Sequence, residues 1–387
     1  MKLLWDLASP TIGTGYSICS RQIVPRLIKD GHDVTIASQT TEENYMWKGI
    51  KIIMGKDAIR LNYYMHAIGD IDYVFTLQSP WGAPSPLSNP VVLATLDLEH
   101  GYMDMADKVR NARFQFCVSQ HNVREFRKLG LNPFYCPWGV DTNTFIKKSD
   151  SREKFNKLHN IPDNTFLIGS VGQSMHSDRK NFVGLLRAFA YFCQRHDNAM
   201  LYIHTTSIPS YSVFSDFLTA NAGSVPNLVY LSEMFGIKDK VIFPDAVKYG
   251  FHQFSEQDMV DKYNAFDVLC LPTKGESFGL PILESQACET PVIVTDTTSC
   301  PEMVDTKSGW LIPVAEDDYF YTDTQTFAAN PRPKMIAEYL EYGLEAWENN
   351  TLDEMGKQAR DSILHFNWDN VFDKHWRPFL EILRRNA

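Results

Sequence analysis

The chain has 387 residues, of which 44% are hydrophobic and 22% charged, and its formal net charge is -10. This length exceeds the size at which one hydrophobic core stops growing, so two domains are expected, and the composition excludes disordered, collagen-like and fibrous proteins. The acidic balance argues mildly against a dedicated nucleic-acid binder.

Short apolar strands alternate with helices along the first part of the chain, a pattern typical of a parallel α/β sheet. The expected elements are a strand at 2–9, a glycine-containing loop at 10–17, a helix at 18–32, strands at 33–38, 71–77, 90–96 and 114–119, and a helix at 121–130 that ends on Gly130.

A second α/β series follows the polar segment 147–164. It consists of a strand at 165–172, a helix at 181–195, strands at 199–205 and 240–245, a helix at 259–266, a strand at 267–272, a helix at 281–288 and a strand at 291–296. The domain boundary is therefore expected within 146–163, between domains at 1–150 and 160–367. In the helical tail, Thr351 and Glu354 match a capping box.

The seven cysteines are scattered without a CxxC pattern and predict reduced core residues. The opening residues lack the pattern of a signal peptide, and no apolar run approaches the roughly 20 residues of a membrane span. These features predict a cytoplasmic protein without an integral membrane segment.

The most informative stretch is 272–305, where a strand is followed by a loop with Gly275 and Gly279 and then by Pro281, a residue that suits the first helical turn. Glycines let the backbone approach a ligand closely, and the free N–H groups of a helix start favour phosphate. The stretch predicts a phosphate-binding loop that needs no metal.

Two carboxylates, Glu276 and Glu284, lie eight positions apart at the two ends of this loop and helix start. Their placement allows one to address a sugar and the other to accept hydrogen bonds from ribose hydroxyls. An equally open alternative is that Glu284 only complements the helix dipole and that Glu276 is solvated.

The run Glu276, Phe278-Gly279-Leu280-Pro281 and Glu284 resembles the signature of the retaining GT-B glycosyltransferases of family 4. The resemblance implies two Rossmann-like domains facing each other across a cleft, with the last helix, about 368–387, packing back on the first domain. It also implies a retaining transfer from a nucleotide-diphosphate sugar, UDP- or GDP-linked, with no cofactor and no metal. The acceptor, a glycan, lipid or small molecule, is not identified.

Other landmarks of the family follow in order. Gly13 and Gly15 resemble the glycine loop near the donor phosphates, the stretch 137–145 resembles the segment that ends the first domain, and 171–181 resembles the first loop of the second domain. Three residues depart from the common pattern: Gln173 stands where arginine is frequent, Trp138 where asparagine is frequent, and Glu289 where glycine is usual.

The resemblance implies roles for several residues. Arg179 and Lys180 neutralise the donor diphosphate, and Glu276 acts at the sugar. The alternative for the two cations is that they lie in a solvated loop. The donor-binding set that the resemblance implies is Gly13, Gly15, Gln173, Ser277, Phe278, Gly279, Leu280 and Glu284. Contacts to the base are expected around 243–247 and 173–177.

On the acceptor side, Asp97 and His100 follow a strand at the edge where open α/β sheets bind ligands, and Tyr16 follows the glycine loop. Relatives place a histidine or an acidic residue here, so Asp97 is a catalytic candidate, with Tyr16 and His100 as acceptor-side candidates. Structural capping of the loops is an equally good interpretation of Asp97 and Tyr16.

Two motifs are set aside. The glycine loop carries Ile18 where a dinucleotide fingerprint has its third glycine, and the DxD spelling at 70–72 directly precedes an apolar strand, so it indicates a turn rather than a metal site. The histidines show no metal-ligand spacing.

Two alternative functions remain. The basic segment 108–128 allows a glycosyltransferase that modifies nucleic-acid bases, although such a segment is more often a solvated face. The second alternative is a catalytically silent nucleotide-sugar binding protein, against which the intact charged residues count.

Overall fold

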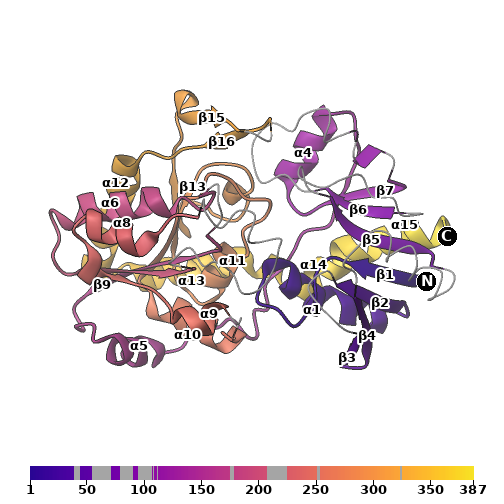
Figure 1. Ribbon diagram of the computed structural model, residues 1–387, viewed down its shortest axis with the longest axis horizontal. Coiled ribbons are helices and arrows are strands. Elements are labelled where there is room, and N and C mark those ends of the chain that lie inside the picture. Colours follow the sequence, from indigo (N-terminus) through magenta and orange to yellow (C-terminus); the bar gives the residue numbers. More distant parts are fainter. Residues whose placement is uncertain are drawn as a thin grey trace. The chain divides into compact units, whose positions relative to one another are not determined.

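The chain forms two compact units in a computed structural model that describes residues 1–38, 44–54, 71–78, 90–94, 107, 109–110, 112–174, 178–206, 225–250, 253–322 and 325–387 (Figure 1). Unit 1 comprises Met1–Gly139, Thr322–Thr326 and Trp368–Ala387, and unit 2 comprises Val140–Tyr321 and Phe327–Asn367.

The described residues of unit 1 form a sheet of eight strands in the order β3-β4-β2-β1-β5-β6-β7-β8. All neighbouring strands are parallel except β3 and β4. The elements are β1 (Lys2–Asp6), α1 (Gly15–Lys29), β2 (Asp33–Ser38), β3 (Tyr45–Trp47), β4 (Ile50–Met54), β5 (Tyr73–Gln78), β6 (Pro90–Ala94), β7 (Phe114–Cys117), α4 (Gln120–Lys128), β8 (Phe134–Tyr135), α14 (Trp368–Val371), a π-helical turn (Phe372–Trp376) and α15 (Arg377–Arg385).

Aromatic packing explains why the carboxyl-terminal helix belongs to unit 1. The Trp376 ring lies 6.1 Å from Trp5 of β1 and 5.2 Å from Phe116 of β7, and it stacks on Trp138 at 5.8 Å. Its indole N–H donates to the carbonyl of Pro137 at 3.1 Å. Trp138, which departs from the family pattern, is therefore a buried core residue of unit 1.

Where unit 2 is described, it contains a parallel sheet of six strands in the order β11-β10-β9-β12-β13-β14 and a separate hairpin, β15–β16. The strands are β9 (Phe166–Val171), β10 (Ala199–His204), β11 (Val241–Ile242), β12 (Val268–Leu271), β13 (Val292–Thr295), β14 (Gly309–Ile312), β15 (Tyr319–Tyr321) and β16 (Phe327–Ala329). Two parallel α/β sheets confirm the predicted fold class.

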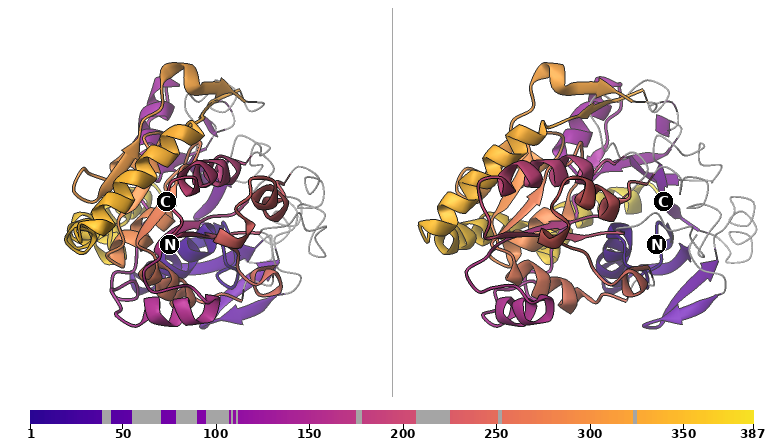
Figure 2. Two further views of the ribbon diagram at one scale, coloured as in Figure 1. Left: turned by 90° about the vertical axis from the view of Figure 1, so that its left-hand side faces the viewer. Right: turned by 60° about the vertical axis from the view of Figure 1, so that its left-hand side comes forward.

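Helices flank this second sheet. They are α5 (Ser151–His159), α6 (Phe182–Cys193), α8 (Leu228–Met234), α9 (Ala246–Gly250), α10 (Glu256–Ala265), α11 (Leu280–Ala287), α12 (Pro333–Glu348) and α13 (Leu352–Ile363), with 3-10 turns at Lys238–Lys240, Cys300–Glu302, Glu316–Asp318 and Leu364–Phe366. The long orange helix in both views of Figure 2 is α12, which contacts α6, β13 and β14.

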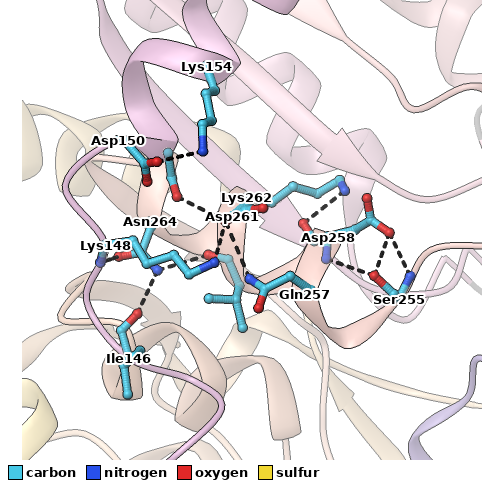
Figure 3. Close-up of polar contacts among 12 residues, drawn as sticks. Ile146, Lys148, Asp150, Lys154, Ser255, Gln257, Asp258, Asp261, Lys262 and Asn264 are labelled. Atoms are coloured by element: carbon cyan, nitrogen blue, oxygen red, sulfur yellow. Dashed lines mark hydrogen bonds and ion pairs between the residues drawn. The ribbon is translucent and has the colours of Figure 1, made fainter.

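The chain passes from unit 1 to unit 2 after Gly139, before the expected window of 146–163. Polar contacts with α10 account for this (Figure 3): the Lys148 N–H donates to Asn264 at 2.6 Å, and the Asn264 amide donates to the Ile146 carbonyl at 2.8 Å. Asp261 accepts from the Lys148 ammonium at 2.9 Å and from the Ser151 hydroxyl at 3.1 Å. The connecting segment is therefore fixed to unit 2.

The predicted capping box at Thr351 and Glu354 is wrong. The Thr351 hydroxyl donates to the carbonyl of Ala346 at 3.1 Å and makes no cap bond to its own helix. A capping box instead begins α10, where Ser255 and Asp258 exchange hydrogen bonds. The Thr351 hydroxyl is bonded to the end of the preceding helix α12, and the spacing of Thr351 and Glu354 alone does not show this competing bond.

Candidate donor-sugar site

The loop between β12 and α11 is held in shape by hydroxyl groups. The Glu276 N–H donates to Thr298 Oγ1 at 2.8 Å, and Ser299 Oγ donates to the carbonyls of Glu276 at 2.9 Å and Phe278 at 2.8 Å. The Thr273 hydroxyl donates to the Gly275 carbonyl at 3.0 Å. These buried bonds fix the path of the loop before any ligand binds.

The loop ends at Gly279, which has φ +106° and is the N-cap of α11, with Pro281 in the first turn of the helix. A Cβ at this position would lie 3.0 Å from Ile282 Cδ1 and 3.2 Å from Met303 Cε, so both the backbone conformation and the space favour glycine. Within the described residues, no side chain caps α11. Pro281 has no N–H and the Ile282 N–H donates to the Gly279 carbonyl at 3.0 Å, so at this helix start it is the Leu280 N–H that suits an anionic ligand.

Glu276 forms a buried ion-paired cluster with the two predicted cations. Its Oε1 accepts from the Lys180 ammonium, and its Oε2 lies 3.2 Å from Arg179 Nη1, which also donates to the Gly275 carbonyl at 2.6 Å. Glu276 is only 4% exposed and Lys180 9%. With two cations against one carboxylate, the cluster carries a net charge of +1.

The cations keep this buried carboxyl ionised. Burial acts to raise the pKa of Glu276, but the charges and hydrogen bonds of Lys180 and Arg179 outweigh it and lower the pKa from 4.5 to about 2. The alternative of a solvated Glu276 is thereby ruled out, because the carboxylate is buried and paired.

The loop after β9 brings the cations to this carboxylate. Asp178 accepts from the Phe182 N–H at the start of α6 at 2.9 Å, while the Arg179 carbonyl accepts from the Lys274 N–H at 2.8 Å. A Cβ on Gly172 would lie 3.1–3.2 Å from the carbons of the Lys180 side chain, so the lysine stem passes directly over Gly172. The loops after the neighbouring strands β9 and β12 thus form one site.

Glu284 lies in α11, where it is 7% exposed and accepts from the Tyr263 hydroxyl at 2.7 Å. Burial and the neighbouring Glu284 raise the pKa of Tyr263, which therefore remains a hydrogen-bond donor. Tyr263, Thr298 and Ser299 were missed by sequence reasoning because nothing in their local sequence connects them with the loop at 272–279.

The remaining donor-side candidates differ in surroundings. Gln173 is exposed after β9, Ser277 is half-buried, and Leu280 is 8% exposed. Phe278 is 5% exposed and its ring lies 5.9 Å from Phe366, so its side chain packs in the apolar interior of unit 2.

The last candidates belong to unit 1. Gly13, Gly15 and Tyr16 lie in unit 1, where Thr14 caps α1 by accepting from the Ser17 N–H. Asp97 and His100 lie outside the described residues.

The basic segment 108–128 is partly neutralised within unit 1. Arg110 lies 3.3 Å from Asp107, Lys128 lies 2.5 Å from Glu125, and Arg113 donates to the Asn386 carbonyl and lies over the Tyr73 ring. Among the described residues of this segment, Arg110 and Lys128 are therefore ion-paired with acidic residues of their own unit.

Among the described residues no cluster of histidine, cysteine and acidic side chains has the arrangement of a metal site. The described part of the DxD spelling, Asp72, accepts from the Lys2 N–H at 2.8 Å at the amino end of β5. No helix in the described ranges combines the length and the apolar character of a membrane span.

Two units that each carry a parallel α/β sheet have the architecture of the GT-B glycosyltransferases. The chain belongs to the family described as "Glycosyl transferases group 1", which it matches over residues 151–362.

Curated relatives include two proteins named D-inositol 3-phosphate glycosyltransferase. The one from Corynebacterium jeikeium is 33% identical over 178 residues, which are 46% of this chain and 38% of the relative. The one from Mycolicibacterium gilvum is 36% identical over 149 residues, which are 38% of this chain and 27% of the relative. The matches thus span well under half the length of these relatives.

Among solved structures, sucrose-phosphate synthase from Thermosynechococcus elongatus has a TM-score of 0.77 at 16% identity and covers 100% of both chains. The Anabaena HepE structure, described as a complex with UDP and glucose, has a TM-score of 0.71 at 14% identity over 98% of this chain and 99% of HepE. At these identities the likeness shows the GT-B fold.

Proposed function

We propose that the chain is a retaining, metal-independent glycosyltransferase that transfers a sugar from a nucleotide-diphosphate donor, UDP- or GDP-linked, to an acceptor hydroxyl. The observation that carries the proposal is the buried cluster of Glu276, Arg179 and Lys180 beside the uncapped start of α11. The description of HepE as a complex with UDP-glucose supports the choice of donor class.

In this proposal the diphosphate binds at the start of α11, where the N–H groups near Gly279 and Leu280 and the net charge of the cluster stabilise it. Arg179 offers two parallel N–H donors and Lys180 a compact positive charge. Together they stabilise the leaving diphosphate, a role that a divalent cation has in metal-dependent transferases. Because Glu276 already neutralises one of the two cations, the site keeps a single excess positive charge until the diphosphate arrives.

Glu276 and Glu284 have different tasks. Glu276 contacts the sugar near the anomeric carbon and stays ionised there because of its lowered pKa. Glu284, oriented by Tyr263, accepts from the ribose hydroxyls.

In the reaction the bond between the anomeric carbon and the phosphate oxygen breaks, and a bond to the acceptor oxygen forms on the same face of the sugar. The acceptor proton passes to the departing phosphate oxygen. No group outside donor and acceptor is consumed.

Calorimetric titration with UDP and GDP in the presence of a chelator tests the donor assignment. Glu284→Ala should weaken nucleotide binding by about tenfold or more, since a buried charged hydrogen-bond acceptor is lost. Glu348→Ala, at an exposed position of α12, is the matched control and should bind as the wild type does. Unchanged affinity in Glu284→Ala would refute the ribose assignment.

Turnover separates an enzyme from a silent binding protein. Glu276→Ala should retain nucleotide binding, because Arg179 and Lys180 are then released toward the phosphates, but lose most of its sugar transfer. A wild-type protein that binds nucleotide sugar and neither transfers nor hydrolyses it would establish the silent alternative.

A further inference from the structure

Both sheets contain a point at which the strand order reverses direction. In unit 2 this point lies between β9 and β12, where the candidate donor site is found. In unit 1 the chain runs from β1 to β2 and β4 on one side and then returns to β5 on the other, so the reversal lies between β1 and β5. Open α/β sheets bind ligands beyond the carboxyl ends of the strands at such a point.

Asp6 is the last residue of β1 and pairs in register with Thr76 of β5, so it lies at the reversal point of unit 1. Thr76 Oγ1 donates to Asp6 Oδ2 at 3.0 Å. Asp6 is only 7% exposed, and in the described part of the chain its other oxygen, Oδ1, is buried with no hydrogen-bond partner. A buried carboxylate oxygen without a donor is costly, so this atom is suited to accept a hydrogen bond from a bound group.

The polar groups of the following loop are occupied elsewhere. The Ser20 hydroxyl donates to the Ala8 carbonyl at 2.7 Å, and Arg21 donates to the Pro10 carbonyl at 2.9 Å. The hydroxyls of Ser9 and Thr11 bond to Tyr45 of β3 at 2.7 and 3.0 Å. These bonds fix the loop without the Asp6 side chain. An aspartate with a structural role would instead accept hydrogen bonds from the backbone N–H groups of the loop.

The state of the Asp6 carboxyl fits contact with a hydroxyl group. Burial raises the pKa of Asp6 to about 6, and the hydrogen bond from Thr76 offsets part of that rise. With a pKa of about 6 the carboxyl is mostly ionised near pH 7, and in this state Oδ1 accepts the hydrogen bond that a sugar hydroxyl donates.

We propose that Asp6 is an acceptor-binding residue, whose Oδ1 takes the hydrogen bond of a hydroxyl on a sugar or polyol ring bound at the carboxyl ends of β1 and β5. This inference rests on the proposed glycosyltransferase function and adds to it one residue that contacts the acceptor.

The test uses the full chain with UDP-glucose and GDP-mannose as donors and with D-glucose, D-glucose 6-phosphate, myo-inositol and D-inositol 3-phosphate as acceptors. In Asp6→Asn the amide oxygen still accepts from Thr76, but an NH2 group replaces Oδ1 and cannot accept. The KM for the acceptor should rise about tenfold or more, while donor affinity stays within about twofold. Asp33→Asn, an exposed aspartate at the opposite end of the sheet, is the control.

Thr76→Val provides a second variant should Asp6→Asn fold poorly, because it keeps the carboxyl and removes only the bond that orients it. It should also raise the acceptor KM without changing donor affinity, a split that a merely structural role would not produce. An unchanged acceptor KM in the folded variants overturns the assignment of Asp6.

Failure of the two proposals can be told apart. Transfer to none of the four acceptors by a protein that binds UDP or GDP overturns the hydroxylated-ring site and leaves the donor site standing. Absence of nucleotide binding overturns the proposed function itself, and the inference with it.

Discussion

The ion pair between Lys180 and Glu276 should contribute strongly to the stability of unit 2. Lys180→Met keeps the apolar stem over Gly172 and removes the charge, leaving Glu276 with Arg179 alone at 3.2 Å. Breaking a buried pair on one side typically costs 3–5 kcal/mol, and because Arg179 remains we expect a loss near the lower end, about 3 kcal/mol. For a unit of this size the melting temperature should fall by about 6–12 °C.

Scanning calorimetry of the wild type, both single variants and the double variant gives a thermodynamic cycle. Glu276→Gln leaves two buried cations uncompensated and should also destabilise, whereas Lys180→Met with Glu276→Gln should recover about 2 kcal/mol relative to the sum of the single effects. Lys154→Met is the control, because its pair with Asp150 is exposed and surface pairs contribute little. Additive single effects would refute the coupling.

The same ion pair makes the free energy of unfolding depend on pH. Because the pKa of Glu276 falls from 4.5 to about 2 on folding, its contribution is complete above pH 4.5 and is lost as the pH falls through 2. This amounts to about 3 kcal/mol. The melting temperature of the wild type should therefore decline more steeply between pH 5 and 2 than that of Glu276→Gln, and parallel curves would contradict the lowered pKa.

Three further substitutions probe the site and its surroundings. Tyr263→Phe removes the donor to buried Glu284 and should cost about 1.5–3 kcal/mol in thermal unfolding and weaken UDP binding in titration; an unaltered melting curve would count against that bond. Gly279→Ala adds close contacts to a residue with positive φ, so it should lower the free energy of unfolding more than Gly130→Ala does. Gly130 has φ +77° with open space around it, and its variant should lose only about 1–2 kcal/mol. Equal losses in the two variants would contradict the crowding at Gly279. Glu289→Gly should leave thermal stability equal or raise it by up to about 1 kcal/mol, since Glu289 has φ +60°, and a clear loss would show that its side chain matters.

Local sequence signals identified the elements that carry the site. The alternating apolar runs predicted β1, β2, β5, β6 and β7 of the first sheet and β9 to β13 of the second, but not β3, β4, β8 or β14. Pro281 marked the start of α11 because proline fits the first helical turn. The glycine at 279 was predicted to let the backbone approach a ligand, and the structure adds a positive φ and close neighbours as reasons for it. The usual glycine at position 289 also has a physical reason, since the residue there is left-handed.

Contacts between distant segments were not predictable. The sequence suggested that Arg179 and Lys180 face a diphosphate while Glu276 faces a sugar, but it did not reveal that all three form one buried cluster. Tyr263 is likewise joined to the site only by the packing of α10 on α11.

Unit 1 shows the same limit. The sequence analysis did not single out Asp6, and its position beside Thr76 follows from pairing between β1 and β5, which are far apart along the chain. Thr351 failed as a cap for a related reason, because the Ala346 carbonyl competes for its hydroxyl.

Stereochemistry in the absence of metal tests the central claim most directly. UDP-α-glucose is incubated with the protein in excess chelator, and proton NMR follows the anomeric configuration of the transferred or released glucose before it mutarotates. Donor turnover through the cluster of Glu276, Arg179 and Lys180 predicts an α-configured product at an undiminished rate, and loss of that product in Glu276→Ala. A β-configured product, or turnover that appears only when a divalent cation is added, would contradict the account.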